Sequence, residues 1–282
     1  MKRFNTRIAV LLLMQFALLH LNISAQEELT LLGNRFFTFS TVVRVNQIET
    51  SRDAFHGTDE STIHTPEGAR KFRETIENAW PGARITWSFS WLALKDQRPN
   101  YVDLKKLVVS YHEKFGDEIT FLPGGYFANM YNTREQINRD LHEGLQMVSA
   151  MVGGGYRPKS IIAGFLAADN LQYLAEKEGI HVCQGNIWSQ YAVDNGDGEG
   201  SISYPYYPSR EHFCKPAQGE KDMIDCVNLD GWTVDFLNAR YPVPRFINGI
   251  RCGSRQGVGP IETILRQGTD IGTKEMLSTT AA

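Results

Sequence analysis

The segments ARITWSFSWLAL (residues 83–94), YVDLKKLVVSYHEKFG (101–116) and EITFLPGGYF (118–127) decide the fold, and they follow one another in the chain. The first and third are almost continuously apolar, as strands are when both faces of a parallel sheet are covered. The middle segment repeats apolar residues at helical spacing and ends at Gly116, a residue typical of helix C-termini. Together they predict a strand, a helix and a second, parallel strand.

The same alternation continues on both sides of this unit. Further strands are predicted at residues 35–49, 160–168, 180–188 and 222–236, and further helices at 65–80, 133–152 and 167–179. Repeated βα units form either an open doubly wound sheet or a (β/α) barrel. No G-x-G-x-x-G motif follows the first strand, which argues against a dinucleotide-binding sheet. We therefore expect an α/β fold, a TIM-like (β/α) barrel of seven or eight strands.

The last part of the chain does not supply the strands that would complete this barrel. Six strands are evident, and residues 259–282 begin a helical pattern and then continue in small polar residues. We therefore expect residues 26–282 to form a single (β/α)-barrel domain that is truncated at its C-terminal end.

The N-terminus has the three regions of a secretory signal peptide. Lys2, Arg3 and Arg7 precede an apolar run at residues 8–21, and small residues follow at 23–25. We expect residues 1–25 to be removed and the protein to be secreted or periplasmic. No later run approaches the roughly 18 apolar residues that cross a bilayer, so no membrane span is expected.

Net charge and cysteine spacing bear on two questions: whether the protein binds nucleic acid and whether it binds zinc. A net charge of −3 and a pI near 6.2 give no reason to expect nucleic acid as a partner. The four cysteines match no zinc-ligand spacing, and the sequence leaves open whether they form disulfides or remain buried thiols.

Two resemblances follow from longer stretches of sequence. Residues 156–190, YRPKSIIAGFLAADNLQYLAEKEGIHVCQGNIWSQ, resemble the middle of the NodB-like polysaccharide deacetylase superfamily. Over nearly its full mature length, the chain is identified as a member of an uncharacterised family of secreted bacterial barrel proteins, a domain of unknown function. Its most distinctive phrases are residues 189–218 and DCVNLDGWTVDF (225–236). The resemblance implies a deacetylase-like barrel that handles carbohydrate.

The metal-binding motifs of that superfamily are absent. Its metal-dependent members carry an Asp-Asp pair after the first strand and a His-x-x-x-His after a later one. This chain has VNQIE (45–49) and GGYFANMYN (124–132) at these places, without a histidine. His56, Asp59 and His64 do not follow a known ligand spacing, and a solvated loop is expected there. Metal-dependent deacetylation is therefore not expected, and no cofactor is predicted.

The loop SQYAVDNGDGEGSISYPYYPS (189–209) is rich in acidic, glycine and tyrosine residues. In the register of an EF-hand, Val193 and Tyr204 occupy the two outer ligand positions, so the EF-hand match fails, although another kind of calcium site stays open. The loop follows a predicted strand, and barrel enzymes place their chemistry at the C-terminal ends of strands. Asp194 is therefore expected near the active site.

Three strand-end carboxylates are the predicted catalytic residues: Glu49, Asp194 and Asp230. Two carboxylates from adjacent strands can act as the acid and the base or nucleophile of a glycoside hydrolase. The alternative for Asp194 and Asp230 is a structural ion pair with Arg210, Lys215 or Arg245.

Aromatic and polar residues near these carboxylates are predicted to contact sugar, because flat rings suit the apolar faces of sugars. They are Trp188, Gln190, Tyr204, Tyr206, Tyr207, His212 and Trp232. The alternative is that the tyrosines pack the loop onto the barrel. We expect a secreted carbohydrate-active protein that hydrolyses a poly- or oligosaccharide or removes a substituent from it. A non-catalytic glycan-binding protein on the same scaffold is the alternative.

Overall fold

The computed structural model describes residues 39–49, 52, 54–126, 128–163, 166–184, 194, 205–229, 245–247 and 250–252. The predicted signal peptide at 1–25 and the predicted C-terminal truncation at 259–282 lie outside these residues. In the described part of the chain, no helix is both long and apolar enough to cross a membrane.

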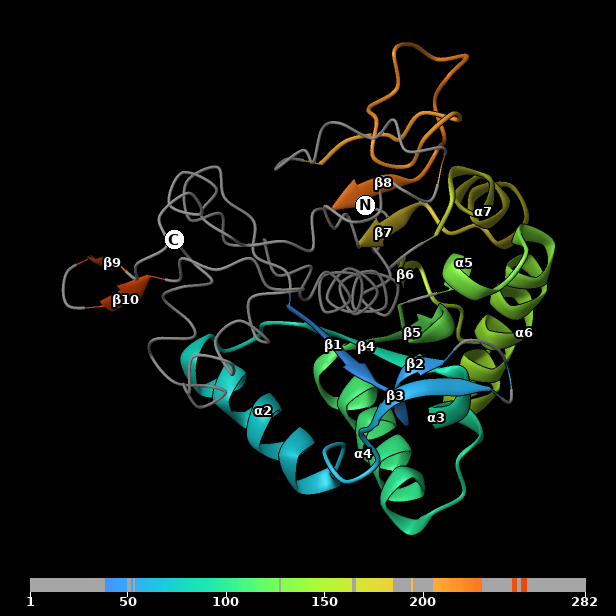
Figure 1. Cartoon of the computed structure of the whole chain (residues 1–282). Coiled ribbons are helices and arrows are strands. Elements are labelled where there is room, and N and C mark those ends of the chain that lie inside the picture. Colours follow the sequence, from blue (N-terminus) through green and yellow to red (C-terminus); the bar gives the residue numbers. More distant parts are fainter. Residues whose placement is uncertain are drawn as a thin grey trace, which may run out of the picture. The chain divides into compact units, whose positions relative to one another are not determined.

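Six parallel strands carry the fold, and they pair in the order in which they occur in the chain (Figure 1). The first sheet has the order β1 (Phe39–Val43), β4 (Ile85–Ser90), β5 (Glu118–Leu122). The second has the order β6 (Ser160–Ile162), β7 (Val182–Gln184), β8 (Val227–Leu229). A strand therefore exists in each of the predicted segments 83–94, 118–127, 160–168, 180–188 and 222–236. Where the structure describes the whole segment, at 83–94, the strand is shorter than predicted.

Side chains link the two sheets. The Thr120 hydroxyl of β5 donates to the carbonyl oxygen of Ser160 in β6 at 2.6 Å, and the Glu118 carboxylate accepts from the Ser160 amide at 2.8 Å. The Ser40 hydroxyl of β1 also donates to the side-chain oxygen of Gln184 in β7. Within the described residues, however, the strands do not close into a barrel.

The predicted long helices form with the predicted caps. They are α2 (Pro66–Ala79), α4 (Pro99–Phe115) and α6 (Arg134–Val152). Thr65 and Thr133 each accept a hydrogen bond from a backbone amide in the first turn of α2 and of α6. Gly116 ends α4 in the left-handed conformation, with φ of 72°. Helices α4 and α6 both contact β5 (Figure 1).

Shorter helical segments follow the strand ends. They are α3 (Trp91–Lys95), a 3₁₀ turn (Pro123–Tyr126), α5 (Ala128–Tyr131), α7 (Ala168–Tyr173) and a π-helical turn (Leu174–Glu178). The segment Trp91–Leu94 was predicted as strand, but the Ser90 hydroxyl accepts from the Ala93 amide at 3.2 Å and starts α3 there.

The predicted strand at 35–49 was wrong in its continuity. After β1 the chain bends, and β2 (Asn46–Glu49) pairs antiparallel with β3 (Phe55–Asp59). The segment of β3 was predicted as a solvated loop, and every residue of it is indeed exposed. Because neither face of β3 is buried, apolar and polar residues do not alternate along it, and the sequence carries no strand signal. A second hairpin that was not predicted joins β9 (Arg245–Ile247) and β10 (Ile250–Cys252).

A glycine allows close packing between α6 and β5. A Cβ atom added at Gly144 would lie 2.6 Å from two ring carbons of Phe121, which is 1% exposed. We expect Gly144→Ala to destabilise the protein by about 1–3 kcal/mol through overpacking, more than the roughly 1 kcal/mol that alanine gains in a helix. Urea unfolding would measure this against Gln146→Ala at an exposed position of α6, which should change little. A neutral Gly144→Ala would contradict the expectation.

A buried ion pair lies at the N-terminal ends of β4 and β5. The Nε atom of Arg73 in α2 is 3.1 Å from Oδ2 of Asp117, and both side chains are at most 1% exposed. Asp117 also accepts from the Trp87 indole at 2.9 Å and from the Ile85 amide at 3.1 Å. Burial raises the pKa of Asp117, against these hydrogen bonds and the Arg73 charge, which lower it. The cluster ties α2 to two strands.

The cysteines that the structure describes with their side chains are free and buried: Cys183, Cys214 and Cys226. Burial, followed by the neighbouring Cys226, raises the pKa of Cys183 well above its ordinary value. The sequence left open whether the cysteines form disulfides or remain buried thiols, and these three are buried thiols.

Candidate functional site

The Glu49 carboxyl lies where β4 ends and α3 begins. Its Oε1 atom accepts from the Ser90 hydroxyl at 2.7 Å and from the Val45 and Asn46 amides at 3.1 and 3.5 Å. Its Oε2 atom accepts from the Leu92 amide, in the first turn of α3, at 3.3 Å. Glu49 was predicted as a strand-end residue, and it is the last residue of β2. Its carboxyl contacts Ser90 at the C-terminal end of the parallel strand β4.

Burial dominates the electrostatics of this carboxyl. Glu49 is 1% exposed, and removal from water raises its pKa above the ordinary value. Hydrogen bonds from Ser90, Val45, Leu92 and Asn46 act in the opposite direction, since they favour the charged form. Because burial wins, Glu49 keeps its proton to a higher pH than an exposed glutamate does.

The loop after β5 closes over the backbone of Glu49. Gly124 and Gly125 have φ of 58° and 54°, values that favour glycine. A Cβ atom at Gly124 would lie 3.2 Å from the carbonyl oxygen of Glu49, and one at Gly125 would lie 3.4 Å from its amide nitrogen. These two glycines allow the loop to approach the β2–β3 hairpin.

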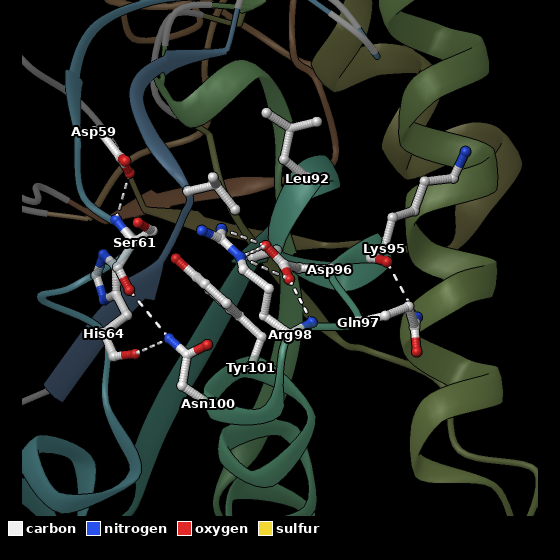
Figure 2. A network of polar contacts seen from close by, with 12 residues as sticks. Asp59, Ser61, His64, Leu92, Lys95, Asp96, Gln97, Arg98, Asn100 and Tyr101 are labelled. Carbon is white, nitrogen blue, oxygen red and sulfur yellow. Dashed lines mark hydrogen bonds and ion pairs between the residues drawn. The ribbon is translucent and has the colours of Figure 1, made fainter.

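A polar network fixes the loop after β3 to the start of α4 (Figure 2). The side-chain amide of Asn100 donates to the carbonyl oxygen of Ser61 at 3.1 Å, and Asp59 accepts from the Ser61 amide at 2.8 Å. In the same view Arg98 makes a forked contact with Asp96 and stacks over the Tyr101 ring, 5.1 Å from its centroid. The network holds the segment that follows the β2–β3 hairpin against the start of α4.

Arg44 joins this network to the hairpin. Its guanidinium contacts both carboxylate oxygens of Glu60 at 2.5 and 2.8 Å, and it donates to the carbonyl oxygen of Gly125 at 3.3 Å. The Tyr101 hydroxyl donates to the carbonyl oxygen of Arg44 at 2.9 Å. Burial raises the pKa of Glu60, but hydrogen bonds from His64 and Arg44 outweigh it and lower the pKa to about 2.

Asp194 is buried and fully engaged by the protein. Its Oδ1 atom accepts from Arg134 at 3.0 Å, and its Oδ2 atom accepts from the Ala168 and Phe213 amides at 2.9 and 3.0 Å. An ion pair was one predicted alternative, and the structure shows one with Arg134 at the start of α6, a residue that was not among the predicted partners. Asp194 therefore ties α6, the start of α7 and the segment around Phe213 together.

We expect Asp194→Asn to destabilise the protein by about 2–3 kcal/mol, because an amide cannot replace both acceptor oxygens of a buried carboxylate. Asp169→Asn is the matched control, since Asp169 is 65% exposed and contacts the same Arg134 at 3.5 Å. An exposed pair of this kind contributes less than about 1 kcal/mol. Chemical unfolding of both variants would measure the difference, and equal losses would contradict the role given to Asp194.

The predicted sugar-contacting residues have different environments. Tyr206 is buried, and its hydroxyl donates to the Phe213 carbonyl at 3.0 Å and accepts from Asn228 at 2.8 Å. His212 is 1% exposed, and its Nδ1 atom accepts from the Cys214 amide at 3.0 Å. Tyr207 is exposed, and its carbonyl oxygen accepts from the Ala217 amide. The remaining predicted residues lie outside the described part of the chain: Trp188, Gln190, Tyr204, Asp230 and Trp232.

Glu49 and Asp194, the two predicted carboxylates that the structure describes, do not offer a metal site. Every oxygen of Glu49 and Asp194 faces hydrogen-bond donors, which a cation would have to replace. Among the described residues, no group of three or more His, Cys, Asp or Glu side chains is placed to hold a metal ion. We therefore derive no metal-dependent step.

A model of a protein family described as a domain of unknown function with a solved structure, DUF3863, matches residues 29–282. The chain belongs to the DUF3863 family. This confirms the predicted membership in a family without assigned activity, whereas the NodB-like link remains a resemblance. No curated protein matches the DUF3863 chain.

One solved structure similar to the DUF3863 chain is from Parabacteroides distasonis and is described as a "putative glycoside hydrolase/deacetylase". The two are 50% identical with a TM-score of 0.74, over 90% of this chain and 58% of that one. The DUF3863 chain thus spans little more than half of that relative. A 4-alpha-glucanotransferase from Thermococcus litoralis shares 16% identity over 74% of this chain and 28% of its own, at a TM-score of 0.41.

Sequence reasoning missed two residues that contact the predicted carboxylates of the DUF3863 chain: Ser90 and Arg134. Ser90 ends an apolar strand, as Glu49 was predicted to do. Considering every polar residue at a strand end, and not only the carboxylates, would have found it. Arg134 looked like an ordinary first-turn residue of a helix, and its partner lies 60 positions away.

Proposed function

We propose that this chain is a carbohydrate-active hydrolase that acts on a poly- or oligosaccharide, with Glu49 as its proton donor. The observation that carries the proposal is Glu49 itself, a 1% exposed carboxyl at the end of β4 whose pKa is raised by burial. A general acid must hold its proton near the working pH, and burial is how proteins achieve this with a glutamate. The 50% identity to a protein described as a glycoside hydrolase/deacetylase supports the substrate class.

The proton donor serves either of two hydrolytic reactions. In glycoside hydrolysis it protonates the glycosidic oxygen as that bond breaks, while a second carboxylate acts as base or nucleophile. In removal of an acetyl group it protonates the leaving oxygen or nitrogen. Asp230 remains the proposed second carboxylate. Asp194 is proposed as a positioning residue, because Arg134 and two backbone amides hold both of its oxygens.

For the fold we propose a (β/α) barrel of which the six parallel strands are a part. Two observations support it. The strands pair in chain order without the reversal of a doubly wound sheet. Ser40 in β1 and Gln184 in β7 make contact although three parallel strands, β4, β5 and β6, come between β1 and β7 in the chain. The C-terminal ends of β1, β4 and β5 are then the face that carries the chemistry.

The test is to incubate the purified chain with soluble polysaccharides and their acetylated forms. New reducing ends indicate glycosidic cleavage, and released acetate indicates deacetylation. Cleavage or acetate release that is retained in full by Glu49→Gln would contradict the role of Glu49. The absence of both products across the panel would contradict the hydrolase.

The second candidate is a glycan-binding protein without turnover. It is favoured by the observation that protein donors engage every oxygen of both Glu49 and Asp194. Retention on a polysaccharide, with neither reducing ends nor acetate released, would select it over the hydrolase.

A further inference from the structure

We propose that Arg52 is a positioning residue for Glu49, because it holds the turn of the β2–β3 hairpin on α6 and covers Trp91, which lies between two donors to the Glu49 carboxyl. The inference rests on the role proposed for Glu49 as proton donor and adds a residue that acts through Glu49 rather than on substrate. Arg52, Trp91, Asp140 and Glu143 are called the Arg52 clasp below.

Arg52 connects the turn of the hairpin to α6 through three short hydrogen bonds. It lies between β2 and β3, three residues after Glu49. Its Nε atom donates to Oδ1 of Asp140 at 2.7 Å, and its two terminal nitrogens donate to the two carboxylate oxygens of Glu143 at 2.7 and 2.8 Å. A guanidinium that donates twice to one carboxylate is fixed in orientation, which a lysine ammonium cannot reproduce. The turn is therefore held in one orientation on α6.

The same guanidinium covers the indole ring of Trp91. The Cζ atom of Arg52 lies 4.3 Å from the ring centroid, and Trp91 is 4% exposed. Trp91 stands in the chain between Ser90, whose hydroxyl donates to Glu49 at 2.7 Å, and Leu92, whose amide donates to it at 3.3 Å. Arg52 thus packs on the residue that joins the two donors. Loss of this packing is expected to loosen both hydrogen bonds and to admit water to the Glu49 carboxyl.

The ion pairs of the clasp are too exposed to contribute much to the stability of the whole protein. The side chains of Arg52 and Glu143 are 30% and 46% exposed, and ion pairs in contact with water contribute little to folding. What the clasp restricts is local, namely the hairpin that carries Glu49. Breaking it is therefore expected to loosen the hairpin without unfolding the core.

Exclusion of water sets the protonation of Glu49. Burial is the largest influence on its pKa and raises it, so water that enters through a broken clasp lowers that pKa. Arg52→Lys keeps every charge around Glu49, so a shift in this variant reports hydration rather than a lost charge. Charged and titratable groups on the elements packed there include Arg44, Glu60, Lys95, Tyr101, Asp140 and Glu143.

The first experiment is hydrogen–deuterium exchange of the intact chain, read by mass spectrometry. Arg52→Lys is expected to speed exchange in peptides that cover β2 and β3 at least about threefold, with α4 unchanged. Glu143→Gln removes the acceptor of the same fork and should act on the same peptides. The two changes together should add little to either one, because both break one interaction. Arg139→Lys is the matched control, since Arg139 is an exposed arginine of α6 that donates to Gln136.

The second experiment measures the pKa of Glu49 in Arg52→Lys. The falling limb of the rate against pH should move to lower pH, the direction opposite to that expected for Ser90→Ala. A carbon-13 titration of the Glu49 carboxyl, assigned by its absence in Glu49→Gln, measures the same shift without any substrate. The clasp is therefore tested even where no polysaccharide is hydrolysed and the proposed hydrolase fails.

Faster exchange of the hairpin together with a lowered pKa of Glu49 supports the inference. Unchanged exchange in Arg52→Lys and Glu143→Gln would overturn the clasp and leave the hydrolase standing. Faster exchange with an unmoved pKa would overturn the positioning role, since a merely structural link between the hairpin and α6 gives that result. Thermal melting of each variant, expected within about 3 °C of the wild type because the pairs are exposed, shows that global unfolding is not the cause.

Discussion

Glu49→Gln is expected to lower turnover of a polysaccharide substrate by about 10²–10⁴-fold, the usual contribution of a positioned general acid. Glutamine has nearly the same shape but carries no proton that it can give to a leaving group. Initial rates at saturating and at low substrate would show the loss in kcat, with retention in affinity gels largely unchanged. A variant that folds and keeps its full rate would refute the assignment.

The pH profile gives a second test of Glu49, using Ser90. An acid must be protonated to act, so the rate should fall as pH rises through the folded pKa of Glu49, which lies above its ordinary value of 4.5. The hydrogen bond from Ser90 lowers that pKa, so Ser90→Ala should move the falling limb to higher pH. A merely structural role of Ser90 would lower stability, because its hydroxyl also caps α3, without moving the limb.

The same raised pKa affects stability with a definite sign. The folded state binds the Glu49 proton more tightly than the unfolded state does. Its contribution to stability is therefore fully present below the unfolded pKa and is lost as pH rises through the folded pKa. Glu60 acts in the opposite sense. Its pKa of about 2 means that its contribution is present above the unfolded pKa and is lost as pH falls towards 2.

Asp117→Ala is expected to cause the largest loss of stability, about 3–5 kcal/mol, because it removes the buried carboxylate beside the buried Arg73 guanidinium and leaves it only Glu77, which is 32% exposed, as an acidic partner. The same change removes the acceptor of the Trp87 indole and of the Ile85 amide. The free energy of unfolding in urea would measure it, with circular dichroism confirming that the variant folds.

Asp103→Ala is the control for that substitution. Asp103 pairs with Lys106 at 3.9 Å, and both side chains are more than half exposed, so the loss should stay below about 1 kcal/mol. Adding Arg73→Met to Asp117→Ala removes a buried charge that has lost its buried partner and should recover part of the stability. Equal losses for Asp117→Ala and Asp103→Ala would show that the buried ion pair contributes no more to the free energy of unfolding than the exposed one.

Local patterns predicted the elements of the fold well where each element carries its own signal. Thr65 and Thr133 start helices because their side chains accept from amides within the next three residues, and Gly116 ends one because it can adopt positive φ. The apolar strands were found because burial on both faces leaves few polar residues. The hairpin of β2 and β3 was missed because every side chain of β3 is exposed.

The candidate site was predicted only in part, and the reason differs from residue to residue. Glu49 was identified because a charge at the end of an apolar strand is visible in the sequence. Its raised pKa was not, because that depends on burial by α3 and on the loop around Gly124. Tyr206 was predicted to contact sugar, but its ring is buried and its hydroxyl is paired with Phe213 and Asn228.

The sequence by itself determined the long helices and the buried parallel strands, because caps, glycine stops and apolar periodicity act over a few residues. The tertiary structure alone decided the partners of the charged and aromatic residues. Arg73 contacts Asp117 across 44 positions of the chain, Arg134 contacts Asp194 across 60, and His56 contacts Tyr131 across 75. Such contacts depend on which strands pair within the sheets and on how the helices pack against them. That arrangement is set by the whole core rather than by any one segment.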